Sequence, residues 1–150
     1  MRGGRRSYSD RYTSSRLAIH TAPVEDFFFY YIKPQETGSR GDVRWVVLNN
    51  DAASVGAFAA TGLPLLTSLS PYTRENVADS RHTIDLEPAG VLYWNLDAAQ
   101  AGLGGDDSWS PRTHPEYQLL ERSYTLVFTL APMGAASARA AVQRAKQLRA

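Results

Sequence analysis

Carboxylates, histidines and glycine-rich stretches are the features of this chain whose spacing could support catalysis or metal binding. Asp106 and Asp107 are adjacent, so in an extended loop their side chains point to opposite faces, and accepting backbone hydrogen bonds suits them better than hydrolysis as a pair. His20, His82 and His114 lie too far apart in the sequence for a short metal-binding motif. Phosphate-binding loops, dinucleotide fingerprints and nucleophile elbows are absent. We therefore expect no metal site in this chain and find no motif that marks a catalytic residue.

Trp109 is the side chain best suited to ligand binding. It follows a flexible stretch with Gly104 and Gly105 and precedes Pro111, a setting in which exposure of a large aromatic ring is costly. An indole face can stack on the apolar face of a sugar while neighbouring polar groups bind the hydroxyls. Burial of the same ring against the chain's own sheet explains its position equally well, so the residues alone leave both interpretations open.

Length and composition indicate an ordinary globular chain. Its 150 residues are 43% hydrophobic and 21% charged, with 16 Lys and Arg against 15 Asp and Glu. That balance argues against intrinsic disorder, a nucleic-acid partner and an anionic membrane surface, and the basic residues near both ends are interpreted as solvated termini. No apolar segment suits a secretory signal or a membrane span, and cysteine is absent. We expect a soluble cytoplasmic protein with no nucleic-acid or membrane partner.

The hydrophobic pattern predicts short β-strands along most of the chain. A helix is expected near 73–79 with Thr73 as its N-cap, followed later by a glycine-rich loop over 102–111. Two of the strands are expected to form a hairpin about the turn at Thr61 and Gly62. The alanine-rich tail predicts an exposed helix outside the core. The expected strands are 15–20, 27–32, 42–48, 55–60, 63–69, 82–86, 91–97, 117–119 and 124–130.

Many short strands separated by turns are typical of an antiparallel β-sandwich or barrel. The alternation of helix and strand that a parallel α/β fold requires is missing from the pattern. The predicted fold class is therefore mainly β and antiparallel.

The loop around Trp109 also carries a recognisable pattern. It reads Gly102-x-Gly104-Gly105-Asp106-Asp107-Ser108-Trp109 and continues with Pro111 and Pro115-Glu116-Tyr117. Further motifs occur in order at 8–11, 24–26, 31–38 and 42–45, and Asp97-x-x-Gln100 leads into the glycines. Together these motifs resemble the C-terminal domain, of the small-chain type, of the large β-galactosidases of glycoside hydrolase family two, over about residues 8–128.

The resemblance implies a fold and an activity. The fold is the second half of a large antiparallel β-sandwich, the galactose-mutarotase-like supersandwich, formed by residues 1–132, with 133–150 as an Ala/Arg-rich helical tail. The activity is hydrolysis of terminal β-D-galactosides such as lactose by the intact enzyme. Its two catalytic glutamates, and the residues through which it depends on Mg²⁺ and Na⁺, lie outside this segment. The isolated chain is therefore expected to be inactive and to hold no cofactor.

The resemblance also implies a site and its partners. In such an enzyme Trp109 forms part of the sugar platform, which favours sugar binding over burial of the ring. The expected partners are a galactoside and the remainder of a β-galactosidase chain or a large catalytic subunit. The loop residues expected to position the ring are Gly104, Gly105, Asp106, Asp107 and Ser108.

Some positions depart from the family pattern. Residues 3–6 read Gly-Gly-Arg-Arg where Gly-x-Gly-Pro-x-Glu is usual, Thr37 replaces a common asparagine, and Ser110 stands where glycine is frequent. The tail beyond Pro132 has no counterpart in the family. Besides a segment of an intact enzyme, the alternatives are a small subunit that pairs with a separate catalytic chain, a stand-alone carbohydrate-binding or structural module, and a non-functional remnant.

Overall fold

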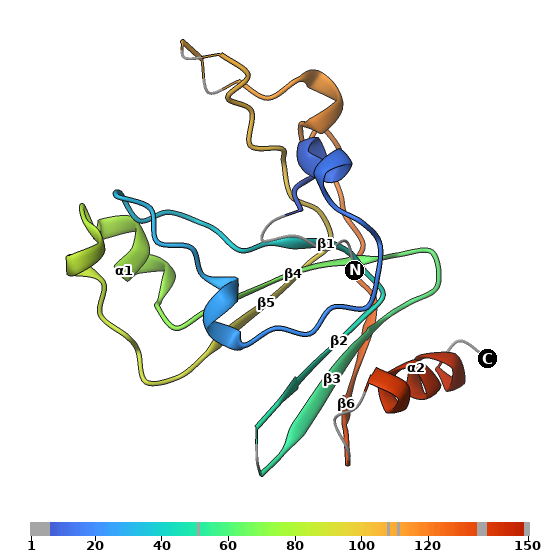
Figure 1. The fold of residues 1–150 in the computed structure, drawn as a ribbon. Helices are drawn as coiled ribbons and strands as arrows, with labels where there is room; N and C mark the ends of the chain where they lie inside the picture. Colours follow the sequence, from blue (N-terminus) through green and yellow to red (C-terminus); the bar gives the residue numbers. More distant parts are fainter. Residues whose placement is uncertain (1–6, 51, 108, 111, 135–137, 149–150) are drawn as a thin grey trace.

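The computed structural model describes residues 7–50, 52–107, 109–110, 112–134 and 138–148. The strands are β1 (Arg40–Val43), β2 (Trp45–Asn49), β3 (Ser54–Ala59), β4 (Leu65–Ser70), β5 (Tyr93–Asp97) and β6 (Phe128–Pro132). The helices are α1 (Arg74–Asp79) and α2 (Ala138–Gln147), with short 3-10 helices η1 (Ser9–Ser14), η2 (Val24–Phe27), η3 (Thr83–Asp85) and η4 (Pro115–Tyr117). The strands form two antiparallel three-stranded sheets, ordered β1-β4-β5 and β2-β3-β6 (Figure 1). The mainly β, antiparallel fold class is therefore confirmed.

One long, bent hairpin links the two sheets. Its first arm, residues 40–49, forms β1 and then β2. The turn after β2 is held by Asn50, whose Oδ1 accepts the amide hydrogens of Ala52 and Ala53 at 3.0 and 2.8 Å. On the returning arm, β3 pairs with β2 and β4 pairs with β1. The chain thus changes from one sheet to the other in the middle of a single hairpin.

The expected hairpin about Thr61 and Gly62 is wrong, because β3 and β4 lie in different sheets. Both strands pair with the same preceding arm, and Val43 stands opposite Leu65. Residues 60–64 therefore form a bend where the returning arm changes sheet, and Gly62 adopts a φ of 80° there. A local turn pattern predicts a change of direction, but the strands that pair afterwards depend on partners elsewhere in the chain.

The two sheets pack against a shared hydrophobic core. The cluster consists of Val43, Val46, Ala57, Ala59 and Leu65, with Trp94, Leu96 and Phe128 packed against it. Val43 and Leu65 have no exposed surface. Side chains from both sheets contribute to the cluster, so the change of sheet within the hairpin is what closes the core. Phe58 belongs instead to a second cluster on the opposite face of β3, as the two-residue period of a strand requires.

The C-terminal helix α2 lies beside the β2-β3-β6 sheet and covers the second cluster (Figure 1). Ala141 and Ala145 have only 1% and 8% of their surfaces exposed, and Ala145 packs with Phe58 and Ala131. Four residues apart, the two alanines lie on one side of the helix. The expectation of an exposed helix outside the core is therefore wrong. Small alanine side chains are enough to form this contact because the large ring of Phe58 in the sheet fills the space between helix and sheet.

Several expected strands are not strands in the structure, namely 15–20, 27–32, 82–86 and 117–119. Residues 82–86 contain η3 instead, and η4 ends at residue 117. In the aromatic run, the Phe28 and Tyr30 rings pack edge-on against the Tyr72 ring, with centroids 5.0 and 6.4 Å apart. Residues with high strand propensity need a neighbouring ladder to form a strand, and here ring contacts hold an extended segment without one.

The helix expected near 73–79 is confirmed as α1. Thr73 is its N-cap, and Thr73 Oγ1 accepts the amide hydrogen of Asn76 at 2.9 Å, which satisfies a free N–H group of the first turn. The strands expected at 55–60, 63–69 and 91–97 correspond to β3, β4 and β5, while 42–48 is divided between β1 and β2. Within the described parts of the chain, no helix has the length and apolar content needed to cross a membrane.

The packing of α2 can be tested with one substitution on each side of the helix. Ala141→Asp places a carboxylate on the buried side, whereas Gln143→Asp places it on the exposed side. We expect the first variant to lose about 2 kcal/mol of unfolding free energy, because an unpaired charge is not buried without displacing the helix. The second should lose about 0.5 kcal/mol or less. Urea denaturation measures both values, and equal losses would contradict the packing of α2 on the sheet.

Candidate functional site

The segment after β5 projects away from both sheets (Figure 1). Within it, 91% of the surface of Trp109 is exposed. The ring is therefore not buried against either sheet, which was the alternative left open by the residues alone. A ring of this size is available to a ligand or a partner, and its role in sugar binding stays a prediction.

Asp107 holds the backbone around the exposed ring. Its Oδ1 accepts the amide hydrogens of Trp109 and Ser110 at 2.8 and 2.7 Å, so the side chain replaces a carbonyl in a tight turn. The prediction that this carboxylate accepts backbone hydrogen bonds is confirmed. The backbone that carries the indole is thus restrained by its own loop.

The glycines before this turn serve two purposes. Gly104 and Gly105 adopt φ angles of 67° and 78°, in the left-handed region that favours glycine. Gly102 is needed for space, because a Cβ atom there would lie 2.7 Å from Cγ of Asp10. Ser108 lies outside the described residues, so its expected part in positioning the ring stays a prediction.

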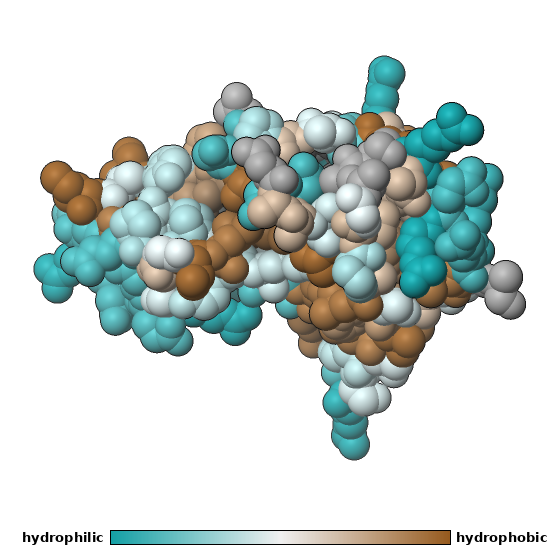
Figure 2. Space-filling view, turned by 90° about the horizontal axis from the view of Figure 1, so that it is seen from below, coloured by the Kyte–Doolittle hydropathy of each residue, from teal (hydrophilic) through white to brown (hydrophobic). Residues whose placement is uncertain are grey.

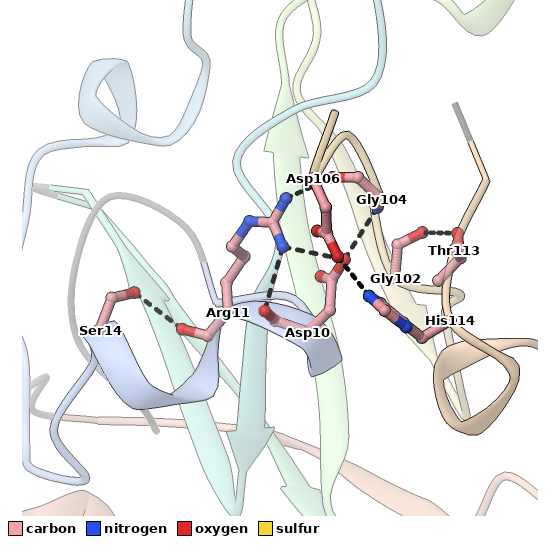
Figure 3. Close-up of polar contacts among 8 residues, drawn as sticks. All are labelled: Asp10, Arg11, Ser14, Gly102, Gly104, Asp106, Thr113 and His114. Atoms are coloured by element: carbon pink, nitrogen blue, oxygen red, sulfur yellow. Dashed lines mark hydrogen bonds and ion pairs between the residues drawn. The ribbon is translucent and has the colours of Figure 1, made fainter. Parts of the chain in front are cut away.

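Asp106 and His114 pair across the loop through Oδ2 and Nε2 (Figure 3). Both side chains are more than half exposed. The hydrogen bond to Asp106 is the main reason that the pKa of His114 is raised, and the negative charges of Asp106 and Glu116 add to the effect. Backbone donors were expected for Asp106, but its bond is to a side chain eight residues later. The turn brings the two together, which a strictly extended loop would not.

The base of the loop is closed by two hydrogen bonds. The Gly102 amide donates to the carbonyl of Tyr117 at 2.9 Å, and Thr113 Oγ1 donates to the carbonyl of Gly102 at 3.0 Å. These bonds join the start of the loop to the segment around η4. Trp109 therefore lies in a loop whose two ends are joined by hydrogen bonds.

The 3-10 helix η1 holds the same loop from outside (Figure 3). Asp10 Oδ2 accepts the amide hydrogen of Gly104 at 2.8 Å, and the Arg11 guanidinium donates to the carbonyl of Gly104 at 2.5 Å. The two side chains also pair with each other at 3.1 Å, and the Asp10 side chain is only 4% exposed. We call this set of contacts between Asp10, Arg11 and Gly104 the η1 clasp.

Sequence reasoning missed the η1 clasp. The motif at 8–11 was counted only as part of a family pattern, and no role was assigned to it. Asp10 and Gly104 are 94 positions apart, so no local spacing connects them. An Asp-Arg pair beside a glycine-rich loop becomes informative only when the fold brings the two segments together.

A second link joins the N-terminal segment to the start of the loop. The Tyr8 hydroxyl donates to Glu36 Oε2 at 2.7 Å, and the Gln100 side chain bonds to the same carboxyl group. Partial burial raises the pKa of Glu36, and these two hydrogen bonds oppose the rise. Burial also raises the pKa of Asp97, against the effect of the Arg74 charge. These motif residues therefore support the stem of the loop.

The histidines lie apart and have separate neighbours. His20 Nε2 lies 3.4 Å from the carbonyl oxygen of Arg16, His82 Nδ1 lies 3.7 Å from Asp85 Oδ2, and His114 pairs with Asp106. In the part of the chain that the structure describes, no three His, Asp or Glu side chains gather closely enough to hold a metal ion. The expectation that this chain holds no cofactor stays a prediction.

Comparison with known proteins places the chain in a family. A family model described as beta galactosidase small chain matches residues 2–130. The chain belongs to the beta-galactosidase small chain family. The beta-galactosidase of Priestia megaterium (strain DSM 319 / IMG 1521) is 37% identical over 134 residues, which are 88% of this chain and 13% of that protein. The beta-galactosidase of Vibrio vulnificus (strain CMCP6) is 35% identical over 126 residues, which are 84% of this chain and 11% of that protein.

A third beta-galactosidase, from Lactobacillus delbrueckii subsp. bulgaricus, is 36% identical over 117 residues, which are 78% of this chain and 11% of the relative. The chain thus spans between 11% and 13% of the length of these relatives. Its Trp109 loop and η1 clasp lie inside the residues matched by the family, while α2 lies beyond them. The resemblance inferred from the motifs is confirmed.

The Asp106–His114 pair predicts a titration. In the folded protein His114 should keep its charge to a pH above its ordinary pKa of 6.5. The pair's contribution is present below that value and is lost as pH rises through the raised pKa. Asp106→Asn should lower the midpoint, whereas Asp107→Asn removes a charge without touching the imidazole. The midpoint of the His114 titration is measured by NMR of the imidazole resonances. A midpoint that Asp106→Asn leaves unchanged would contradict the pairing.

Glu36 predicts a pH dependence of stability. Its pKa is raised above the ordinary 4.5, so the stability linked to its protonated form is present below pH 4.5 and is lost as pH rises through the raised value. Glu36→Gln keeps an oxygen acceptor for the Tyr8 hydroxyl but does not titrate, so the free energy of unfolding should depend less on pH in this variant. Urea unfolding between about pH 4 and 7.5 measures the slope, with the exposed Glu25→Gln as control. Identical slopes for wild type and Glu36→Gln would rule out the effect.

Proposed function

We propose that this chain supplies part of the galactoside-binding site of a β-galactosidase, with Trp109 as the platform on which the sugar ring stacks. The observation that carries the proposal is a ring that is 91% exposed on a loop whose backbone is held by hydrogen bonds. Covering apolar surface is favourable by about 25 cal/mol per Å². A restrained loop also loses little conformational freedom when a ligand binds.

The chemistry of stacking limits the class of ligand. A pyranose offers a face of C–H bonds to an indole and directs its hydroxyls to polar groups at the rim. The relatives of this chain are named beta-galactosidases. A terminal β-D-galactoside, such as lactose, is therefore the substrate class that we assign to the assembled enzyme.

We assign the hydrolytic step to carboxylates of the larger protein. Retaining hydrolysis uses two carboxyl groups about 5 to 5.5 Å apart on either side of the glycosidic bond. The carboxyl of Glu36 is bonded to Tyr8, a side chain that is 1% exposed, so it serves a contact between two segments of the fold. On this proposal the isolated chain is catalytically inactive, and Trp109 acts beside a catalytic centre that other residues provide.

An exposed apolar segment supports assembly with a larger partner. Residues 119–130 lead into β6 and expose several large side chains, among them Leu120 at 71% and Leu130 at 57%. β6 is also the outer strand of its sheet, where backbone groups are free to pair. Figure 2 shows hydrophobic surface, in brown, open on the face seen from below. Such surface marks a protein contact, and the remainder of a β-galactosidase is the partner that we assign.

The position of α2 favours a second candidate function. The helix covers the outer face of the β2-β3-β6 sheet with residues of this same chain. That face therefore needs no cover from another domain. A small subunit that pairs with a separate catalytic chain would use the same Trp109 loop and differ only in how the two parts are joined.

The role of Trp109 can be tested in a chimera in which this chain replaces the matching segment of the Priestia megaterium β-galactosidase. We expect Trp109→Ala to lower kcat/KM for o-nitrophenyl β-D-galactoside by about 10- to 100-fold, as loss of roughly 1.5–3 kcal/mol of apolar contact requires. Trp109→Phe should lose less, because it keeps an aromatic face. Steady-state rates provide the measurement.

The control for the chimera is Ile84→Ala in η3, since that side chain is 90% exposed and lies outside the loop. A similar loss in Ile84→Ala, or no loss in Trp109→Ala, would contradict the platform role. Calorimetry of the isolated chain with galactose separates the alternatives. Absence of binding is expected for a segment that needs its partner, whereas binding that Trp109→Ala abolishes would show a self-sufficient carbohydrate-binding module.

A further inference from the structure

We propose that Asp10 and Arg11 of η1 are positioning residues for Trp109, and that they act through the backbone of Gly104. The inference rests on the proposed function, in which Trp109 contacts the galactoside. It extends that function to a segment nearly a hundred residues away in the sequence, whose side chains do not need to touch the sugar.

The geometry of the η1 clasp suits this role. The Asp10 carboxylate accepts a hydrogen bond from the N–H of Gly104, and the Arg11 guanidinium donates one to its C=O. The backbone is therefore held on both sides of one Cα atom. A glycine at this point would otherwise act as a hinge, because it rotates more freely than any other residue. With both polar groups occupied by charged partners, Gly104 becomes a fixed point from which the turn carrying Trp109 begins.

The burial of Asp10 indicates that orientation is what the clasp provides. Its side chain is 4% exposed. Its second oxygen, Oδ1, is buried and has no hydrogen-bond donor among the described residues. A buried carboxylate with an unmet oxygen is costly, and an apolar contact would join two segments at a lower cost. Such costs are tolerated where a directional contact matters for function.

The contact between Asp106 and His114 is weaker than the clasp. Asp106 and His114 are 55% and 57% exposed, and exposed ion pairs contribute little because water and salt screen them. The Asp107 turn restrains only the residues next to Trp109. The η1 clasp, by contrast, ties Gly104 to a segment outside the loop through a buried carboxylate, and its loss should free the ring more than loss of the His114 pair.

The first test measures the loop without any sugar. Asp10→Ala in the full chain should raise the hydrogen-exchange rate of the Gly104 amide by about tenfold or more. Asp10→Asn keeps an oxygen acceptor and should raise it less. Ser14→Ala is the matched control, because Ser14 Oγ donates to the Arg11 carbonyl at 2.7 Å within the same η1 helix but does not contact the loop. Exchange that is unchanged in Asp10→Ala, or equally raised in Ser14→Ala, would overturn the proposal.

The second test asks whether Asp10 acts through Trp109. In the Priestia megaterium chimera, Asp10→Ala should raise KM for o-nitrophenyl β-D-galactoside about 3- to 10-fold, a coupling of the size found between residues of one hydrogen-bond network. Ser14→Ala should leave KM unchanged. In a Trp109→Ala background the Asp10→Ala effect should disappear. An equal loss with and without the indole would overturn the proposal, since Asp10 would then affect only stability.

The two tests separate this inference from the function on which it rests. If Trp109→Ala leaves KM unchanged while Asp10→Ala still accelerates exchange at Gly104, the platform role is wrong and the clasp remains as a restraint on the loop. If Trp109→Ala raises KM but Asp10→Ala changes neither KM nor exchange, the platform role stands and the clasp is wrong. Should Asp10→Ala fail to fold, Asp10→Asn carries both measurements.

Discussion

The pairing of residues 40–49 with two different strands is the constraint on which the rest of the structure depends. Because β2 pairs with β3 and β1 pairs with β4, a single hairpin produces two sheets with a shared core. β4 then pairs with β5 along its other edge, and β5 ends at Asp97, just before the loop. The place where Trp109 stands is therefore decided by strand pairing far from the loop itself.

Polar contacts connect the N-terminal segment to this loop. Tyr8 bonds to Glu36, and Asp10 and Arg11 bond to Gly104. A buried polar group left unpaired costs about 1–3 kcal/mol, so such contacts tolerate little displacement. They suit a position where the direction of the backbone matters. Large apolar side chains are exposed instead along 119–130, in a chain whose relatives are several times longer.

Local signals predicted the elements that local interactions hold. The N-cap of α1 at Thr73 needs only a residue three positions away, and it was correctly predicted. The hairpin about Thr61 was wrong because β3 and β4 each pair with other strands. The strand at 27–32 was wrong because, among the described residues, no strand pairs with this segment. The burial of α2 was missed because its alanines depend on Phe58 of the sheet for a core.

The sequence by itself determined the family, the mainly β antiparallel class and the turn that presents Trp109, because turn chemistry and motif order are written in neighbouring residues. Only the tertiary structure decided that the ring is exposed, that Asp106 faces His114, and that η1 holds Gly104. The reason is physical. A charged side chain restrains a backbone group only within hydrogen-bond distance, and the pairing of the sheets brings Asp10 that close.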